Sequence, residues 1–177
     1  MCAIEPQPVI TTQRLRLRRP RRSDAARIAE LLNDLDVARM TAHVPHPYGL
    51  SDAEAYLARV DHASPDEKAM FIIEHPAEGA IGAIGFHSEG QRRTELGYWL
   101  GKAYWGCGFA TEATKAALVW ASREWKRRHV MARHFSDNPA SGEVLCKAGF
   151  LYTGDVEFGR SAARDAEVPS RMMVWLA

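Results

Sequence analysis

Two patterns of apolar and polar positions divide the first part of the chain into an expected strand and an expected helix. Residues 14–18 alternate strictly between arginine and leucine, which is typical of a strand with one solvent-facing side. Apolar residues then recur at helical spacing as far as Leu35, with Ser23 or Asp24 as the N-cap. We expect the leucines to point into the core, and the six arginines between positions 14 and 22 to form a solvated face rather than an anionic docking surface.

The middle of the chain changes from a loop to a helix and then to strands. Two prolines in residues 44–48 exclude a regular helix there. Ser51 and Glu54 stand three residues apart in the pattern of a capping box, which predicts the start of a second helix. Short apolar runs separated by turn residues predict three successive antiparallel strands, at residues 69–74, 80–87 and 94–100.

Residues 95–116 carry the order strand, glycine turn and helix. Gly106 and Gly108 lie in the turn, and apolar residues from Ala113 to Trp120 follow at helical spacing. The first turn of a helix leaves backbone N–H groups without partners, and the helix dipole adds about half a positive charge there. Glycines let the backbone approach a ligand closely. This stretch therefore predicts a binding site for a phosphate group.

Two common kinds of phosphate loop are excluded by the residues of this turn. A dinucleotide-binding loop would have a third glycine where Thr111 stands. The Gly-Lys-Ser or Gly-Lys-Thr sequence of a nucleotide hydrolase is absent. The ligand is therefore expected to be a phosphate-bearing molecule of another kind.

The last third of the chain predicts a second strand that leads into a helix. Residues 129–135 are expected to run parallel to the strand that ends at Leu100, because a helix connects the two. Asn138 as N-cap, Pro139 at the first helical position and Gly149 as the stop predict a short helix. Both helix N-termini then meet at one edge of the sheet, where such folds bind ligands. A polar loop at residues 159–167 is expected between two final strands, at residues 150–158 and 169–176.

The composition is that of an ordinary globular protein and narrows the choice of partners. The 177 residues, 46% hydrophobic and 25% charged, fit one domain over residues 1–177 with a core at about residues 12–176. Lys and Arg number 23 and Asp and Glu 22, so the net charge of +1 argues against nucleic acid or an anionic membrane as the main partner. No apolar run approaches the roughly 18 residues of a membrane span, and the start lacks the features of a signal peptide.

Cysteine and histidine usage favours a reducing compartment and no metal centre. The three cysteines, Cys2, Cys107 and Cys146, are odd in number and lack metal-ligand spacing, as do the histidines. We therefore expect a cytoplasmic protein without a metal or a disulfide framework. The sequence leaves a homodimer open.

The glycine turn resembles the coenzyme A loop of the GCN5-related N-acetyltransferases (GNAT), whose pattern is Gln/Arg-x-x-Gly-x-Gly/Ala. Gly108 and Ala110 occupy the fourth and sixth places of that pattern, and Trp105 replaces its first residue. The replacement is familiar from the branch that acetylates protein N-termini, including the ribosomal-protein alanine acetyltransferases. Their loop is similar to Tyr-Trp-Gly-x-Gly-x-Ala-Thr-Glu-Ala, which matches residues 104–113 here.

Two further segments resemble the same family. Residues 12–25, with Thr-x-Arg-Leu-x-Leu-Arg and a later Asp-Ala, are similar to the opening of that branch. Residues 138–150 resemble its second signature, Asn-x-x-Ser followed by Lys-x-Gly-Phe. In relatives the asparagine amide hydrogen-bonds the pantetheine arm, and the serine lies near the thioester sulfur. In order and spacing the resemblance extends from Thr12 to Trp175.

The resemblance implies a mixed α/β GNAT fold, with a mainly antiparallel sheet of about seven strands, a central parallel pair and about four helices. It implies acetyl-coenzyme A as cosubstrate and transfer of the acetyl group to a primary amine, which attacks the thioester directly in a ternary complex. A protein N-terminal α-amine is the favoured acceptor; a small-molecule amine and a non-catalytic coenzyme A sensor are the alternatives. The implied coenzyme-binding residues are Tyr98, Leu100, Trp105, Gly106, Cys107, Gly108, Phe109, Ala110, Thr111, Asn138 and Ser141.

The implied reaction needs a base for the charged amine and an acid for the departing thiolate. Glu95, on the strand before the loop, is the candidate base, directly or through water, and an ordinary solvated carboxylate is the alternative. Ser141 is the first candidate acid and Tyr152 the second. Cys107 is not expected to be a nucleophile, because no histidine lies close to it in sequence. Glu112, in the first helical turn, is expected to interact with the helix dipole.

Overall fold

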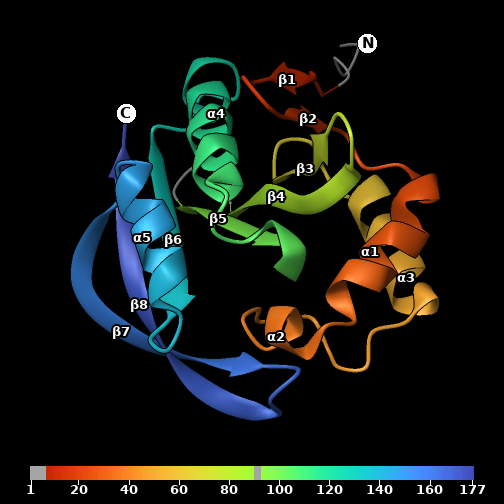
Figure 1. Ribbon diagram of the computed structural model, residues 1–177. Helices are drawn as coiled ribbons and strands as arrows, with labels where there is room; N and C mark the ends of the chain where they lie inside the picture. The colour runs from red at the N-terminus through yellow and green to blue at the C-terminus, as the bar shows by residue number, and fades with distance from the viewer. Residues whose placement is uncertain (1–6, 90–92) are drawn as a thin grey trace.

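The computed structural model describes residues 7–89 and 93–177, which fold around one eight-stranded sheet (Figure 1). Its strand order is β1-β2-β3-β4-β5-β6-β8-β7, and the strands are β1 (Ile10–Thr11), β2 (Arg16–Arg18), β3 (Lys68–His75), β4 (Gly79–Glu89), β5 (Arg93–Leu100), β6 (His129–Phe135), β7 (Leu151–Ser161) and β8 (Ala166–Leu176). The described residues form the helices α1 (Ala25–Leu32), α2 (Leu35–Ala38), α3 (Leu50–Asp61), α4 (Phe109–Arg123) and α5 (Pro139–Lys147), with 3₁₀ turns η1 (Arg22–Asp24) and η2 (Lys102–Tyr104).

The mixed α/β architecture expected from the sequence is confirmed, with one parallel pair in an otherwise antiparallel sheet. Only β5 and β6 run parallel among the strand pairs of the described residues. The sheet has one strand more than expected and the fold one helix more. β1 has 2 residues and α2 has 4, which is too short for either to show a period in the sequence.

β5 and β6 are paired over a short stretch only. Their register begins with Thr94 opposite Val130 and ends with Leu96 opposite Ala132, although β5 continues to Leu100. The two strands therefore part toward the ends that lead into α4 and α5. An unpaired strand edge of this kind offers backbone N–H and C=O groups to an extended ligand.

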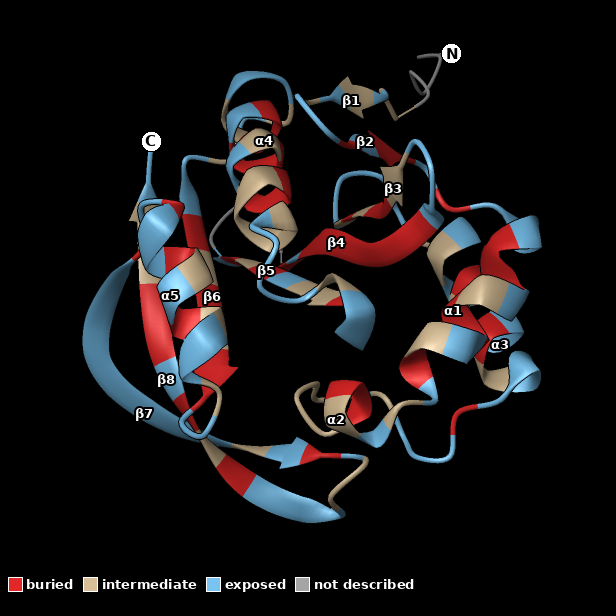
Figure 2. Ribbon diagram, viewed as in Figure 1, coloured by how far each residue is buried: buried red, intermediate tan, exposed pale blue. Residues whose placement is uncertain are grey.

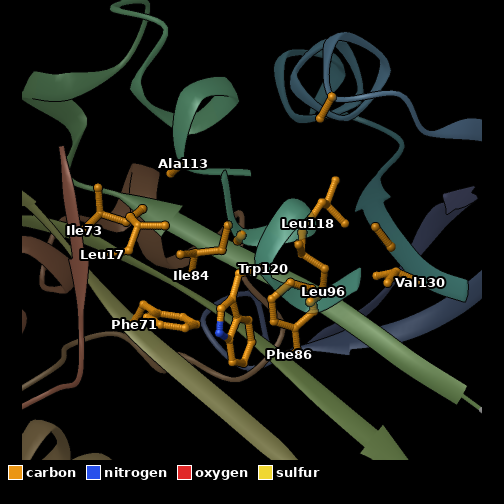
Figure 3. Close-up of a cluster of buried hydrophobic side chains, with 14 of the residues drawn as sticks. Leu17, Phe71, Ile73, Ile84, Phe86, Leu96, Ala113, Leu118, Trp120 and Val130 are labelled. Atoms are coloured by element: carbon orange, nitrogen blue, oxygen red, sulfur yellow. The ribbon is translucent and has the colours of Figure 1, made fainter. Parts of the chain in front are cut away.

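The sheet is covered on both faces, and its two cores take alternate residues of the same strands (Figure 2). Phe71 and Ile73 of β3 lie in the larger cluster under α4, whereas Ile72 between them lies in the cluster under α1 and α3. Trp120 of α4 packs edge-on against Phe71, with ring centroids 5.1 Å apart (Figure 3). Because successive side chains of a strand point to opposite faces, this alternation shows which residues of β5 face which helices.

The expectation that all the N-terminal arginines are solvated was wrong for Arg18. Its side chain is 7% exposed and donates to both oxygens of Asp24, at 2.8 and 2.9 Å, and to Glu74 at 2.7 Å. Asp24 also accepts a hydrogen bond from the backbone N–H of Arg21, so its carboxylate pairs with Arg18 instead of capping α1. The alternating pattern could not reveal this, because one partner lies 56 residues away on β3.

Three expected element boundaries were also wrong. The first helix ends before Leu35, which begins the separate short helix α2. α3 starts at Leu50, and its first turn is capped by Asp52, whose carboxylate accepts from the N–H of Gly49 at 2.8 Å, rather than by Ser51 and Glu54. Most of the expected loop at residues 159–167 belongs to β7 and β8, and the turn between them occupies residues 162–165.

The tip of the β7–β8 hairpin contacts the segment that follows α2. The N–H of Ala162 donates to the carbonyl of Ala42 at 3.0 Å. Arg164 donates from Nε to the carbonyl of Arg39 at 2.8 Å and pairs with Asp137 at 2.7 Å. These contacts join two segments that lie far apart in the sequence. Both segments lie below β5 in Figure 1.

Asp24→Asn is expected to lower the free energy of unfolding by about 3 kcal/mol at pH 7, because it leaves the buried guanidinium of Arg18 without its main partner. Burial alone would raise the pKa of Asp24, but hydrogen bonds from Arg18 and from the backbone N–H of Arg21 outweigh it and lower the pKa below its usual value. A depressed carboxyl pKa stabilises the fold above the unfolded pKa of about 3.9, and this contribution disappears as the pH falls through the folded-state pKa.

Urea denaturation of Asp24→Asn and the parent at pH 7 and at pH 3 measures this effect. The matched control is Asp61→Asn, which removes an exposed pair with Arg19 at 3.5 Å and is expected to cost less than about 1 kcal/mol. Equal losses for the two variants at pH 7, or a loss for Asp24→Asn that does not shrink at low pH, would contradict the assignment.

Candidate active site

The glycine turn between β5 and α4 takes a backbone conformation that requires glycine. Gly106 has φ +73° and Gly108, the N-cap of α4, has φ +79°. Both values lie in the left-handed region, which side chains with a Cβ rarely adopt. The indole Nε1 of Trp105 donates to the carbonyl of Leu100 at 2.9 Å and so holds the start of the turn against the end of β5. The loop conformation is therefore fixed at the N-terminus of α4, where the N–H groups of the first turn have no partner within the helix.

Arg14, from the turn between β1 and β2, holds this loop from outside. Its Nη1 donates to the carbonyl of Cys107 at 3.0 Å, and its Nε pairs with Glu112 at 2.7 Å. The guanidinium also lies 4.6 Å from the centroid of the Phe109 ring. This role could not be predicted from the sequence, because Cys107 and Arg14 lie 93 residues apart.

Glu112 joins the N-terminal segment to the first turn of α4. Its carboxylate accepts from the hydroxyl of Thr12 at 2.7 Å and from the backbone N–H of Arg14 at 2.8 Å, in addition to the ion pair. Burial alone would raise the pKa of Glu112, but these hydrogen bonds outweigh burial and lower it. The expected interaction with the helix dipole is therefore only part of its role.

The open side of the loop fits an anionic ligand. A hollow of about 410 Å³ is lined by Gln13, Gly108, Thr111, Glu112, Lys115 and Lys147. Two lysines add positive charge to the N-terminus of α4, and the carboxylate of Glu112 is already paired with Arg14. The residues present therefore match the phosphates of a coenzyme A molecule.

Arg14→Leu is expected to weaken coenzyme A binding about tenfold while leaving the fold intact. The leucine keeps apolar contact with Phe109 but loses the hydrogen bonds to Cys107 and Glu112, so the loop has to be ordered when the ligand binds. Titration calorimetry with coenzyme A measures the affinity. Arg16→Leu removes an exposed neighbour with only a 3.6 Å pair and should bind normally; an unchanged affinity for Arg14→Leu would rule out the loop-ordering role.

The first turn of α5 meets β5 through a second set of polar groups. The side-chain oxygen of Asn138 accepts from the N–H of Ser141 at 3.2 Å, which confirms Asn138 as the N-cap. The hydroxyl of Tyr98 lies 2.7 Å from the hydroxyl of Ser141 and 3.2 Å from its carbonyl oxygen. The fold thus brings together three of the residues that the sequence assigned to the coenzyme site.

Glu95 lies on the other face of β5. Leu96 and Tyr98 pack against the cluster under α4, so the alternation of the strand directs Glu95 to the opposite face. The register of β4 with β5 runs without a shift from the pair Gly82 and Leu100 to the pair Glu89 and Arg93, so no bulge rotates the side chain. Glu95 pairs with Arg133 of β6, Oε1 to Nε 3.0 Å, and its side chain is 27% exposed.

Tyr152 contacts α5 through its hydroxyl, which lies beside Gly142, the residue after Ser141. In His134, Nδ1 lies 2.9 Å from the carbonyl of Phe135, so in the neutral ring Nδ1 carries the hydrogen and Nε2 accepts. The hydroxyl of Tyr152 then donates to Nε2 at 3.0 Å. Arg171 covers the Tyr152 ring at 4.2 Å, in a separate hollow of about 370 Å³ beside α5.

Neither described cysteine forms a disulfide. Cys107 and Cys146 are exposed and unpaired, and Cys2 lies outside the described residues. Within residues 7–89 and 93–177, no group of three or more His, Cys, Asp or Glu side chains is placed to hold a metal ion. Over the same residues, no helix is long and apolar enough to cross a membrane.

The glycine loop follows the end of β5, and Glu95 lies on the same strand, one residue before its last pairing with β6. The family model described as the acetyltransferase (GNAT) domain matches residues 14–151. The chain therefore belongs to the GNAT acetyltransferases.

Known proteins agree with this assignment over most of the chain. The uncharacterized N-acetyltransferase YoaA of Bacillus subtilis is 30% identical over 157 residues, which cover 83% of this chain and 85% of that protein. The ribosomal-protein-serine acetyltransferase of Escherichia coli is 30% identical over 109 residues, 59% of this chain and 60% of its own length. The protein is therefore an acetyl-coenzyme A-dependent N-acetyltransferase, as its sequence implied.

Solved structures show the same fold in enzymes with different acceptors. RimL, a ribosomal L7/L12 α-N-protein acetyltransferase in complex with coenzyme A, has a TM-score of 0.83 at 15% identity, with coverage of 96% of this chain and 98% of that one. The spermidine N-acetyltransferase of Vibrio cholerae with coenzyme A and spermine has a TM-score of 0.78 at 20% identity, with coverage of 93% and 96%. The fold alone therefore leaves the acceptor undetermined.

Proposed function

We propose that this enzyme acetylates the α-amine of a protein N-terminus, with Glu95 as the general base. The observation that carries the proposal is the placement of Glu95 and Ser141 on opposite faces of β5, beside the unpaired stretch between β5 and β6. The coenzyme approaches from the side of α4 and α5, and the amine from the side of α1 and α3. The two meet where the strands part.

The coenzyme is held mainly by backbone groups. The loop residues proposed for the phosphates are Trp105, Gly106, Cys107, Gly108, Phe109, Ala110 and Thr111. Beyond Leu96 the free edge of β5 faces the gap, so the backbone of Tyr98 and Leu100 is proposed to pair with the extended pantetheine arm. The side-chain oxygen of Asn138 is used by the helix cap, so its amide group is the part that donates to the arm.

The reaction forms an N–C bond and breaks the C–S bond of the thioester. An ammonium group has no lone pair, so Glu95 first removes a proton from it, directly or through a water molecule. The neutral amine attacks the carbonyl carbon, and the oxygen takes up negative charge. The nitrogen, which becomes positive on attack, loses its second proton to solvent as the C–S bond breaks, and the electron pair of that bond stays on sulfur. The hydroxyl of Ser141 donates a hydrogen bond to that sulfur, which takes its proton from solvent. Tyr152 is the less favoured donor, because its hydroxyl is held by His134.

The charge around Glu95 favours an α-amine over a polyamine. Arg133 pairs with Glu95 and adds a positive charge beside the proposed base, so the site opposes a ligand that carries several positive charges. An α-amine has a pKa of about 8, whereas a lysine or polyamine amine lies near 10.4, so a carboxylate base is better matched to the α-amine. The name of the Escherichia coli relative, ribosomal-protein-serine acetyltransferase, is in line with this choice.

A mass-spectrometric panel of acceptors tests the proposal. It contains peptides with a free N-terminus, the same peptides with a blocked N-terminus and an internal lysine, and spermidine. We expect the free peptides to be acetylated with a kcat/KM at least about tenfold above that for spermidine and for the blocked peptides. Faster acetylation of spermidine or of the blocked peptides would assign the enzyme to small amines or lysine side chains.

A further inference from the structure

The side chain of Tyr98 connects β5 to the first turn of α5 through a contact between its hydroxyl and Ser141. It follows Leu96, the last residue of β5 that pairs with β6, by two positions, and its ring packs against the cluster under α4. The hydroxyl reaches the first turn of α5, where it lies 2.7 Å from the hydroxyl oxygen of Ser141 and 3.2 Å from the carbonyl oxygen of the same residue.

The single proton of Tyr98 allows two arrangements. If Tyr98 donates to the carbonyl oxygen of Ser141, the Ser141 hydroxyl donates to Tyr98, and the Ser141 proton is used inside the protein. If Tyr98 donates to the Ser141 hydroxyl oxygen, the Ser141 proton is free to point at a ligand. Only the second arrangement lets Ser141 donate to a departing sulfur.

The proton of Tyr98 is held firmly at neutral pH. Burial raises the pKa of Tyr98 to about 12, and the hydrogen bond with Ser141 opposes this only in part. A complete transfer of the Tyr98 proton would leave a buried phenolate, which is costly in an apolar surrounding. Tyr98 therefore acts as a hydrogen-bond donor and not as a proton source.

We propose that Tyr98 is a positioning residue for the leaving group: its hydroxyl donates to Ser141 and so directs the Ser141 proton to the coenzyme sulfur as the C–S bond breaks. The inference rests on the proposed role of Ser141. Negative charge that grows on sulfur strengthens the Ser141 hydrogen bond, and the Tyr98 hydrogen bond behind it strengthens with it. The effect of Tyr98 is therefore larger in the transition state than in the bound complex.

Tyr98→Phe keeps the ring and removes the hydroxyl. We expect kcat to fall about tenfold with little change in coenzyme A affinity, because the lost interaction acts mainly in the transition state. Tyr56→Phe, a ring on α3 that packs against the other core cluster, is the matched control and should retain the parental kcat. Parental kcat in Tyr98→Phe overturns the inference.

The identity of the leaving atom separates this role from a structural one. The acetyl selenoester of the same coenzyme has a better leaving group, and the acetyl oxygen ester a poorer one. The deficit of Tyr98→Phe is expected to shrink with the selenoester and to grow with the oxygen ester. The same deficit with all three donors would overturn the inference, because a misfolded site does not depend on the leaving atom.

The Ser141→Ala background separates the failure of this inference from the failure of the proposed function. If Tyr98 acts through Ser141, Tyr98→Phe costs nothing further in Ser141→Ala, whereas independent effects multiply. A slowed Ser141→Ala with multiplicative effects overturns the role of Tyr98 alone. A Ser141→Ala variant with parental kcat overturns the role of Ser141 and, with it, that of Tyr98.

Discussion

Glu95→Gln is expected to lower turnover at neutral pH by about 100-fold, with little change in coenzyme A affinity. Glutamine keeps the size of the side chain and an oxygen that accepts from Arg133, but it cannot take a proton from the incoming ammonium. The coenzyme loop lies on the opposite face of β5, so donor binding does not depend on this side chain.

The deficit of Glu95→Gln is expected to shrink as the pH rises. Near and above the α-amine pKa of about 8, more of the acceptor arrives neutral and no longer needs a base. The rate of the variant should therefore follow the free amine, while the rate of the parent levels off at lower pH. Rates of thiol release between pH 6 and pH 9.5, with a peptide whose chemical step limits the rate, measure both curves.

Glu143→Gln is the matched control for the base. Its carboxylate lies on the surface of α5 with a side chain 72% exposed and a 3.8 Å contact to Lys147, so turnover should stay parental. Near-parental turnover of Glu95→Gln at neutral pH would show that bulk water or another group takes the proton of the amine. Glu95 would then be only a strand carboxylate paired with Arg133.

Gly108→Val is expected to raise the dissociation constant of coenzyme A by about 100-fold or more. The residue has φ +79°, where a β-branched side chain costs about 1–3 kcal/mol, and the side chain would stand at the N-terminus of α4 where phosphate approaches the backbone. The Cβ itself would lie 3.4 Å from the guanidinium of Arg14, so the loop has to change shape to relieve the strain.

Gly79→Val is the control that separates the cost of backbone strain from the loss of coenzyme A binding. Gly79 has φ +70°, its Cβ would meet nothing within 4 Å, and it is the first residue of β4. The two variants should lose similar stability in thermal unfolding, but only Gly108→Val should lose coenzyme A binding by calorimetry. Unchanged affinity in a folded Gly108→Val variant would show that the loop is an ordinary turn.

The parts of the fold that could be predicted are those with a strong local signal. Strands β3 to β5 were recognised because each is a short apolar run between turn residues, and helix α4 because its apolar residues recur at helical spacing. β7 was cut short because 9 of its 11 residues are exposed, so it shows no alternation and its polar end reads as a loop (Figure 2).

The candidate site also combines features that could be predicted from the sequence with features that could not. The glycine loop and the Asn138 cap depend on neighbours in sequence, and both were predicted from short patterns. The partners of Glu95, Ser141 and Cys107 were not predicted, since Arg133, Tyr98 and Arg14 reach them only when distant segments meet; the last two pairs are separated by 43 and 93 residues. The residue types were thus visible in the sequence, whereas their hydrogen bonds required the fold.

Direct transfer of the acetyl group from coenzyme A to an amine is the central claim, and intact-mass spectrometry combined with thiol detection tests it most directly. With acetyl-coenzyme A and no amine, we expect no acetyl adduct on the protein, including on the exposed Cys107, and no thiol beyond slow hydrolysis. On addition of a peptide with a free N-terminus, one thiol should appear for each acetylated peptide. A burst of thiol with an acetylated protein before any amine is added, or bound coenzyme with no turnover on any amine, would contradict the account.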